Sequence, residues 1–257
     1  MSERGRWAGR HAGKDRVRER VWKTLEETGI AIGPALSMIP NFSGADMAAY
    51  FLAQTPEWKA AKTVKTNPDA AQMPIRLRAL YEGKTVYAPV PYLTRDFPYL
   101  RIDPARMSAM GISFELAATA QGFVDHGERI GFEAVERLDF CVVGSVAVSR
   151  TGGRTGKGAG FADLETAIFQ ELGLLPETTP IVTTVHSCQL VPDADVVLEP
   201  HDAPLDMIAT QSELIITECR RARPEGVDWE RIRPDQFATI PFLTELRARM
   251  LARRRTG

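Results

Sequence analysis

A glycine-rich segment that carries two basic residues constrains this chain more than any other feature. Residues 152–160 read Gly-Gly-Arg-Thr-Gly-Lys-Gly-Ala-Gly, and they stand between an apolar run at residues 140–148 and a helical pattern that begins at Phe161. Glycine lets backbone N–H groups turn toward a ligand without steric conflict, and the start of a helix adds partial positive charge. The pattern predicts a strand, a phosphate-binding loop and a helix in succession, with a polyphosphate as the ligand.

The charged and main-chain groups of this segment are the first candidate site residues. Arg154 and Lys157 supply full positive charges, and Asp163, in the first helical turn, is placed to hold a Mg²⁺ ion that bridges phosphate oxygens. The residues expected to present main-chain groups to the ligand are Gly153, Gly156, Gly158, Ala159, Gly160 and Phe161. The alternative interpretation is a glycine-rich connection with a solvated Arg and Lys, because glycine loops alone are weak signals.

The segment matches neither of the two best-known nucleotide motifs. A P-loop needs Gly-Lys followed by Ser or Thr, whereas Gly158 follows Lys157 here. A dinucleotide fingerprint needs G-x-G-x-x-G, whereas the glycines at 156, 158 and 160 alternate with single residues. An ordinary P-loop NTPase and a Rossmann dehydrogenase are therefore both disfavoured.

Composition favours one globular domain. The chain has 257 residues, of which 44% are hydrophobic and 25% charged, and its formal net charge is −1. This balance argues against general affinity for nucleic acid or an anionic membrane, and no apolar run approaches the roughly 20 residues of a spanning helix. We expect a mobile basic arm at residues 1–13, a single domain at 14–257, a cytoplasmic location, and a monomer or homodimer.

Three widely spaced cysteines give no metal-ligand spacing and suit a reducing compartment. They are Cys141, Cys188 and Cys219. Cys188 follows His186 by two residues, so a nucleophilic pair can be imagined, but a buried thiol is the favoured interpretation.

Helical and strand patterns alternate along the chain, which predicts an α/β fold with a mostly parallel sheet covered on both faces. Helices are predicted at 14–28, from a capping box of Ser43 and Asp46 to residue 53, at 70–82, at 105–122 in two pieces broken at Gly111, at 161–173 and at 242–254. Strands are predicted at 85–90, 139–148, 180–185, 207–209 and 214–217.

Several motifs in this order resemble the 5-formyltetrahydrofolate cyclo-ligase family. They are Lys14-x-x-x-Arg18, Gly83-Lys84-Thr85-Val86, Arg154-x-Gly156-x-Gly158-x-Gly160-Phe161-x-Asp163, Gln189, and Glu199-x-His201-Asp202. The resemblance covers residues 14–217. Ile39-Pro40-Asn41-Phe42 and Ile240-Pro241-Phe242-Leu243 make the chain more similar to a divergent branch, the methenyltetrahydrofolate synthetase domain-containing proteins.

This resemblance implies a three-layer α/β/α sandwich of the cyclo-ligase (NagB/RpiA-like) kind and a reaction that needs ATP and Mg²⁺. In that family the γ-phosphate of ATP is transferred to the formyl oxygen of 5-formyltetrahydrofolate. The neighbouring nitrogen then closes the ring and expels phosphate, which gives 5,10-methenyltetrahydrofolate. Aligning the oxygen with the γ-phosphorus and neutralising phosphate charge would fall to Lys14, Arg18, Arg154 and Lys157, with Mg²⁺ on Asp163. The implied substrate residues are His186, Gln189, His201 and Asp202, although His201 and Asp202 could equally cap the turn after Pro200.

The chain departs from authentic cyclo-ligases where the folate would bind. Ala162 replaces a second aromatic residue, Leu164 replaces an arginine, and Val64-Lys65-Thr66-Asn67 stands where a glutamate near the pterin is expected. We therefore hold three hypotheses: a folate cyclo-ligase, an enzyme that activates a different formyl or amide compound, such as a thiamin-related one, and a non-catalytic nucleotide-binding protein. RNA binding ranks last, because the chain has no aromatic run typical of an RNA-recognition module.

Overall fold

The computed structural model describes residues 11–90, 98–218, 221–232, 234–240 and 242–256. Most of the predicted basic arm and Cys219 lie outside these residues. Ala12 and Gly13 belong to helix α1 (Ala12–Glu27), which begins two residues before the predicted start at Lys14 because the His11 side chain caps it by accepting a hydrogen bond from the Lys14 backbone N–H.

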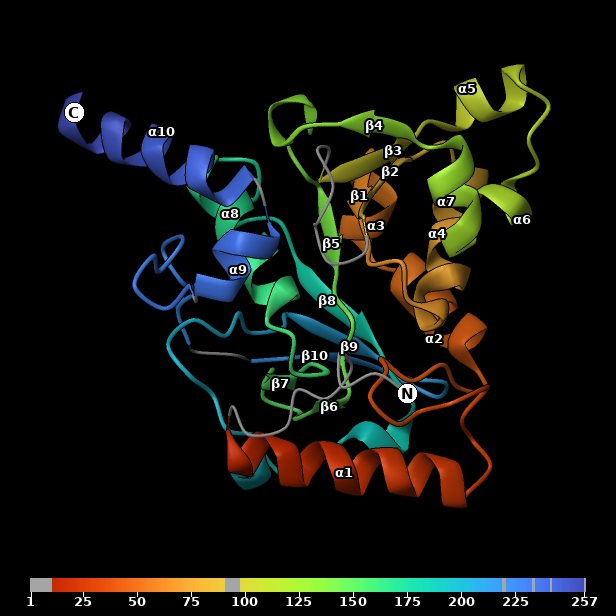
Figure 1. The fold of residues 1–257 in the computed structure, drawn as a ribbon. Coiled ribbons are helices and arrows are strands. Elements are labelled where there is room, and N and C mark those ends of the chain that lie inside the picture. Colours follow the sequence, from red (N-terminus) through yellow and green to blue (C-terminus); the bar gives the residue numbers. More distant parts are fainter. Residues whose placement is uncertain (1–10, 91–97, 219–220, 233, 241, 257) are drawn as a thin grey trace.

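An eight-stranded mixed sheet forms the centre of the molecule, in the order β10-β9-β8-β5-β1-β2-β3-β4 (Figure 1). The five central strands, from β9 to β2, are parallel, and antiparallel pairs close both edges. The strands are β1 (Thr63–Lys65), β2 (Thr85–Pro89), β3 (Tyr99–Ile102), β4 (Glu128–Ile130), β5 (Phe140–Val142), β8 (Ile181–Thr184), β9 (Met207–Ala209) and β10 (Leu214–Ile216). The predicted α/β class with a mostly parallel sheet is confirmed.

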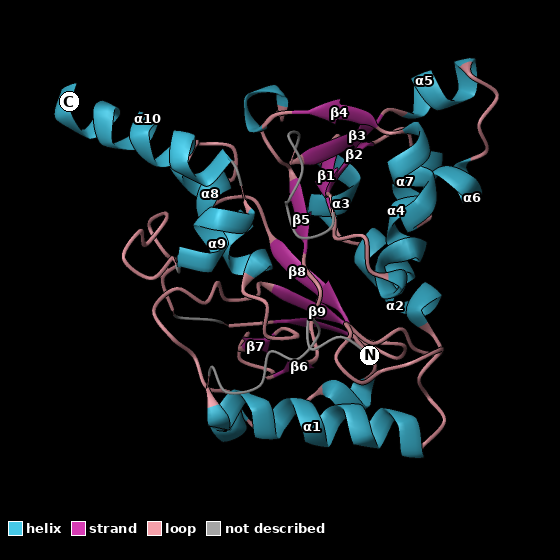
Figure 2. Ribbon diagram, in the orientation of Figure 1, coloured by secondary structure: helices cyan, strands magenta, loops and turns pink. Residues whose placement is uncertain are grey.

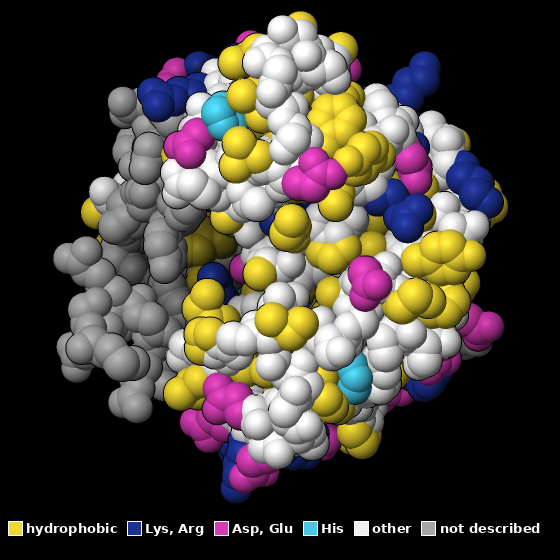
Figure 3. All heavy atoms as spheres, turned by 90° about the vertical axis from the view of Figure 1, so that its right-hand side faces the viewer, with side chains coloured by type: hydrophobic (Ala, Val, Ile, Leu, Met, Phe, Trp, Pro, Cys, Tyr) yellow, Lys and Arg dark blue, Asp and Glu magenta, His cyan; other side chains and the backbone are white. Residues whose placement is uncertain are grey.

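Helices cover both faces of this sheet and complete the three layers (Figure 2). One layer contains α2 (Ala45–Ala53), α3 (Pro56–Ala60), α4 (Met73–Tyr81), α5 (Pro104–Ala109), α6 (Phe114–Ala117) and α7 (Ala120–His126). The other layer contains α8 (Phe161–Glu171), α9 (Pro234–Thr239) and α10 (Phe242–Thr256). Figure 3 shows the outer surface on the α2–α7 side, where hydrophobic side chains are interspersed with polar and charged ones.

Alternation along the central strands divides the core into two hydrophobic clusters. Phe140 and Val142 of β5 belong to the cluster under α2 and α4, whereas Cys141 between them belongs to the cluster under α8 and α10. Successive strand residues point to opposite faces, so a strand buried on both sides reads as a continuous apolar run. This explains why apolar runs alone identified β2, β5, β8 and β9. The central strand β1 was not predicted, because only one of its three residues, Val64, is apolar.

The two antiparallel strands β3 and β4 were not predicted. The segment 105–122 was predicted as two helices, but it contributes to three short ones, because Asp103, Ser113 and Thr119 each cap a new helix with a side-chain oxygen. The Ser43 and Asp46 capping box is also wrong. Helix α2 starts after Gly44, which has a φ of 88° and makes no side-chain cap.

The central sheet has a topological switch point between β1 and β5. From β1 the chain proceeds to β2 on one side, and it later returns to β5 on the other side of β1. In open α/β sheets a crevice forms at the carboxyl ends of the strands at such a point. Helix α1 lies across this end of the sheet, beside the small hairpin of β6 (Ala147–Val148) and β7 (Arg154–Thr155) (Figure 1).

The α8 layer depends on a cluster of aromatic side chains. Phe169 is fully buried, and its ring meets those of Tyr99 and Phe132 at centroid distances of 5.1 and 5.5 Å. We expect Phe169→Ala to lower the free energy of unfolding by roughly 3–5 kcal/mol, measured by urea denaturation. Leu251→Ala on the exposed face of α10 is the matched control, with an expected change under about 0.5 kcal/mol. Equal effects would contradict this account of the core.

Candidate functional site

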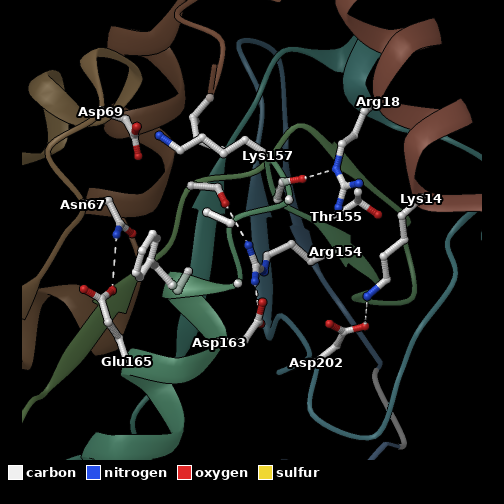
Figure 4. A pocket seen from close by; sticks show the side chains of 18 of the residues that line it. Lys14, Arg18, Asn67, Asp69, Arg154, Thr155, Lys157, Asp163, Glu165 and Asp202 are labelled. Atoms are coloured by element: carbon white, nitrogen blue, oxygen red, sulfur yellow. Dashed lines mark hydrogen bonds and ion pairs between the residues drawn. The ribbon is translucent and has the colours of Figure 1, made fainter. Parts of the chain in front are cut away.

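A pocket of about 250 Å³ opens at the switch point, between α1 and the carboxyl ends of the central strands. Its walls come from segments far apart in the sequence: α1, the loop after β1, the end of β2, Gly144 after β5, the segment from Arg154 to Glu165, and residues 199–202, with Ile39. Figure 4 shows basic side chains entering it from α1 and from the β7–α8 loop. Segments distant in sequence therefore converge on one cavity.

The glycine loop is shorter than predicted because the apolar run before it is split. Only residues 140–142 belong to the main sheet, while Ala147 and Val148 pair with β7 in the hairpin. Gly153 lies in this hairpin, outside the pocket, and a Cβ there would approach Ser149 Oγ to 2.8 Å. Gly153 is therefore needed for the close packing of the hairpin turn.

The second part of the loop does line the pocket. The lining residues include Gly156, Lys157, Gly158, Ala159, Gly160 and Phe161, as the sequence predicted. Gly158 and Gly160 have φ values of 100° and 71°, which strongly favour glycine. Gly160 is also the N-cap of α8, so the positive end of that helix faces the cavity.

Arg154 lies at the base of the pocket and is only 5% exposed. One of its guanidinium nitrogens donates to the Gly144 carbonyl at 2.9 Å, and the other donates to Asp163 Oδ1 at 2.5 Å. Burial opposes its charge, but the Asp163 carboxylate outweighs this effect and raises the pKa of Arg154. Arg154 therefore keeps its positive charge although it is buried.

Lys14 and Arg18 lie one turn apart on α1 and both reach the pocket. Lys14 Nζ donates to Asp202 Oδ2 at 2.6 Å and to Glu199 Oε2 at 3.0 Å. Arg18 Nε donates to the Gly156 carbonyl at 2.7 Å, and its Nη1 donates to Asp15. The basic face of this helix is thus buried against the glycine loop rather than solvated.

His201 and Asp202 also line the pocket, beside Glu199. Asp202 has a capping role as well, because its Oδ2 accepts the Glu199 backbone N–H at 2.7 Å. Partial burial of Glu199 opposes ionisation, but its hydrogen bond and proximity to Lys14 lower its pKa. The geometry therefore agrees with both interpretations of this segment: His201 and Asp202 line the cleft, and Asp202 also caps the turn.

His186 and Gln189 do not reach the pocket. They form a reciprocal cap on a short 3₁₀ helix, η5 (Ser187–Gln189), and the Gln189 amide donates to the carbonyls of Ser145 and Val146. The His186 ring packs edge-on against Phe42 and lies 3.2 Å from Cys188 Sγ. Burial lowers the pKa of His186 and raises that of Cys188, which favours the neutral forms over a nucleophilic pair.

Several pocket residues were missed by the sequence reasoning, among them Asn67 and Asp69 in the loop after β1, and Glu165 in α8. Asp69 provides a carboxylate on the wall where its loss was expected, and Lys65 instead points into the protein interior. Burial raises the pKa of Asp69, an effect that the charges of Lys157 and Arg76 reduce. The usable signal was position, because Asn67 and Asp69 directly follow a central parallel strand.

The acidic residues fit a Mg²⁺ ion held jointly with phosphate. No group of three or more His, Cys, Asp or Glu side chains suited to a metal occurs in the described part of the chain. Magnesium usually takes only one or two carboxylates, together with substrate phosphates and water. Asp163 and Asp202 both line the pocket and are the carboxylates that would serve, and without a metal they pair with Arg154 and Lys14.

Comparisons with known proteins agree with this architecture. The model of the 5-formyltetrahydrofolate cyclo-ligase family matches residues 10–211. The methenyltetrahydrofolate synthase domain-containing proteins of Bos taurus and Homo sapiens are 38% and 36% identical to the chain, over 91% and 92% of its length. The matched regions span 62% of those two proteins. The Aquifex aeolicus 5,10-methenyltetrahydrofolate synthetase structure has a TM-score of 0.50 at 20% identity, covering 81% of this chain and 95% of that one.

These matches establish the class of protein. The fold is that of the cyclo-ligases, a three-layer sandwich with its pocket at the switch point of the sheet. The chain belongs to the 5-formyltetrahydrofolate cyclo-ligase family. None of the helices within the described ranges is long and apolar enough to span a membrane.

The raised pKa of Asp69 predicts a pH-dependent stability. Between the ordinary Asp pKa of 3.8 and the raised value, the folded protein binds more protons than the unfolded chain, so the free energy of unfolding falls as pH rises through this window. Asp69→Asn removes the charge, so it should increase stability at pH 7 and lose this advantage as pH approaches 4. Urea denaturation between pH 4 and 8 measures the effect, with exposed Asp125→Asn as control. An Asp69→Asn variant less stable at pH 7 would contradict the assignment.

Proposed function

We propose that this protein is an ATP- and Mg²⁺-dependent enzyme that phosphorylates a formyl or amide oxygen on a small molecule. Its substrate is 5-formyltetrahydrofolate, which it converts to 5,10-methenyltetrahydrofolate, or a related formyl compound. The observation that carries the proposal is the convergence of Lys14, Arg18, Arg154 and Lys157 on residues 156–161 of the glycine loop. The proposed partner is a small molecule in the cytoplasm rather than a nucleic acid or a membrane.

The charges of the pocket support a triphosphate as one ligand. Lys14, Arg18 and Arg154 each have a carboxylate within hydrogen-bonding distance, supplied by Asp202 with Glu199, by Asp15 and by Asp163. A bound phosphate would share these cations, and it would accept backbone N–H groups from the loop before α8. Lys157 comes from that loop and faces Asp69 across the cavity (Figure 4).

The chain's own groups can perform the work that phosphoryl transfer needs. Arg154 is held in one position by Gly144 and Asp163, so its charge is pre-organised for phosphate oxygens. Lys14 and Arg18 would orient the phosphates from the α1 side, and Lys157 would neutralise charge on the transferring group. When bound through Asp163 and Asp202, Mg²⁺ would supply further charge neutralisation.

A second candidate is a nucleotide-dependent enzyme that acts on a different formyl or amide compound. Ala162 lines the pocket where authentic cyclo-ligases have an aromatic ring, so a stacking surface is reduced. Leu164 packs against the apolar core instead of entering the pocket, so the missing arginine has no replacement there. These differences leave the phosphate side of the pocket intact and alter the side that would hold the substrate.

Nucleotide binding can be tested through Lys157, a partly exposed pocket residue. We expect ATP with Mg²⁺ to raise the melting temperature of the wild type, and Lys157→Ala to weaken ATP binding about tenfold, the loss of one charge-assisted hydrogen bond. Isothermal calorimetry gives the affinity. Lys23→Ala, on the exposed side of α1, should bind ATP as the wild type does. Absence of any ATP effect on the wild type would refute the proposal.

Turnover separates the two candidate substrates. With ATP, Mg²⁺ and 5-formyltetrahydrofolate, the first candidate predicts phosphate release and the absorbance of a methenyl product, both absent without ATP. The second candidate predicts ATP binding with no such product.

The Asp163→Asn variant tests the proposed Mg²⁺ ligand. It should lose most of the Mg²⁺ dependence of ATP affinity, with circular dichroism confirming that the variant is folded.

A further inference from the structure

A buried lysine lies at the centre of the sheet, on the face that packs under α8 and α10. Lys65 is paired with Tyr87 on one side and with Cys141 on the other, and Cys141 is paired with Ile181. Its three neighbours in this row belong to the hydrophobic cluster under α8 and α10. Lys65 is 0% exposed. Its ammonium group is therefore buried among side chains of this hydrophobic cluster, which come from both neighbouring strands.

Glu165 of α8 neutralises this charge. Lys65 Nζ lies 2.9 Å from Glu165 Oε2, and the Glu165 side chain is only 1% exposed. Burying both charges carries a large desolvation penalty, and replacing such a pair by apolar residues of similar volume is often neutral or stabilising. Fold stability alone therefore does not explain why these two residues stand at the switch point.

The ion pair fixes the side-chain amide of Asn67. Lys65 Nζ donates to Asn67 Oδ1 at 3.3 Å, and Asn67 Nδ2 donates to Glu165 Oε2 at 3.4 Å (Figure 4 shows the second contact). An ammonium group can only donate and a carboxylate can only accept, so the amide has one favourable orientation. One N–H and one oxygen lone pair of Asn67 remain for another partner.

Buried polar groups also fix the backbone around Asn67. Its N–H donates to Gln72 Oε1 at 2.7 Å, and its carbonyl accepts Arg76 Nη1 at 2.6 Å. Arg76 is 1% exposed and also donates to the carbonyls of Asp69 and Ala118. Side chain and backbone are thus both held, with Asn67 in the pocket wall opposite Lys14 and Arg18 (Figure 4).

We propose that the Lys65–Glu165 pair is a positioning device, and that Asn67, held by it, is a specificity-determining residue that hydrogen-bonds the polar edge of the formyl-bearing substrate. A group that both donates and accepts, such as the amide or amino edge of a heterocycle, matches the remaining capacity of Asn67. This inference rests on the proposed function for its substrate and on the structure for the positioning. The phosphate side of the pocket plays no part in it.

The positioning can be measured without any ligand. The chain contains only two asparagines, Asn41 and Asn67, so ¹⁵N-asparagine labelling gives two pairs of side-chain amide signals, which Asn67→Ala assigns. In the wild type, the Asn67 amide should give sharp signals that exchange slowly with water. In the double variant Lys65→Met/Glu165→Leu these signals should broaden and exchange quickly, while those of Asn41 stay unchanged. Unchanged Asn67 signals would overturn the positioning role.

Kinetics with 5-formyltetrahydrofolate test whether Asn67, held by the ion pair, contributes to substrate recognition. The double variant should melt at or above the wild-type temperature, raise KM for this substrate about tenfold, and leave the affinity for ATP within about threefold. Adding Asn67→Ala to the double variant should raise KM no further, because all three substitutions disrupt the same hydrogen bond between Asn67 and the substrate. Lys65→Met alone should lower the melting temperature, since it leaves Glu165 buried without its cation.

The outcomes separate this inference from the proposed function. An unchanged KM in a folded double variant would show that the Lys65–Glu165 pair has only a structural role. If the wild type binds ATP but releases no phosphate with 5-formyltetrahydrofolate, the folate assignment fails and the substrate half of the inference fails with it. The amide spectrum still decides whether the ion pair orients Asn67.

Discussion

The buried guanidinium of Arg154 joins the three segments on which the pocket depends. It ties the hairpin strand β7 to the carbonyl of Gly144, where the chain leaves the central strand β5, and to Asp163 in the first turn of α8. A charge this deeply buried is stable only with a carboxylate and a carbonyl held in fixed geometry. The path of the glycine loop between β7 and α8 is set at both ends by these contacts.

Charge balance explains how a pocket with four cations can exist before any ligand enters. Lys14, Arg18 and Arg154 are compensated by acidic side chains, which keeps the basic groups close together despite their mutual repulsion. The same acids limit the attraction to a phosphate, so a metal ion that occupies Asp163 and Asp202 would free the cations for the nucleotide. Phosphate and metal would thus favour each other's binding in this arrangement.

The sequence predicted the sheet class, the parallel strands β2, β5, β8 and β9, and the pocket loop, because these depend on local apolar runs and on glycine. It missed the central strand β1, in which Thr63 and Lys65 flank a single apolar residue. It did not predict the edge strands β3 and β4, whose pairing depends on residues distant in sequence, nor the hairpin that takes Gly153 away from the pocket. Lys14 and Arg18 could be connected to the loop only through a family resemblance. Asn67 and Asp69 were missed because the strand before them, β1, was not predicted, and Glu165 because a buried acidic residue inside a helix has no distinctive spacing.

One feature of the site affects how the chain matures during synthesis. Lys14 pairs with Asp202, a separation of 188 residues, so the helix made first finds its partner only after most of the polypeptide has left the ribosome. The apolar stripe of α1, formed by Val17, Val21, Trp22 and Leu25, is likewise only partly covered by nearby residues, because part of its cluster comes from residues 146–147 and 188–191. The α1 segment therefore stays partly uncovered until these later segments have been made, and apolar surface exposed in this way raises the risk of aggregation during folding.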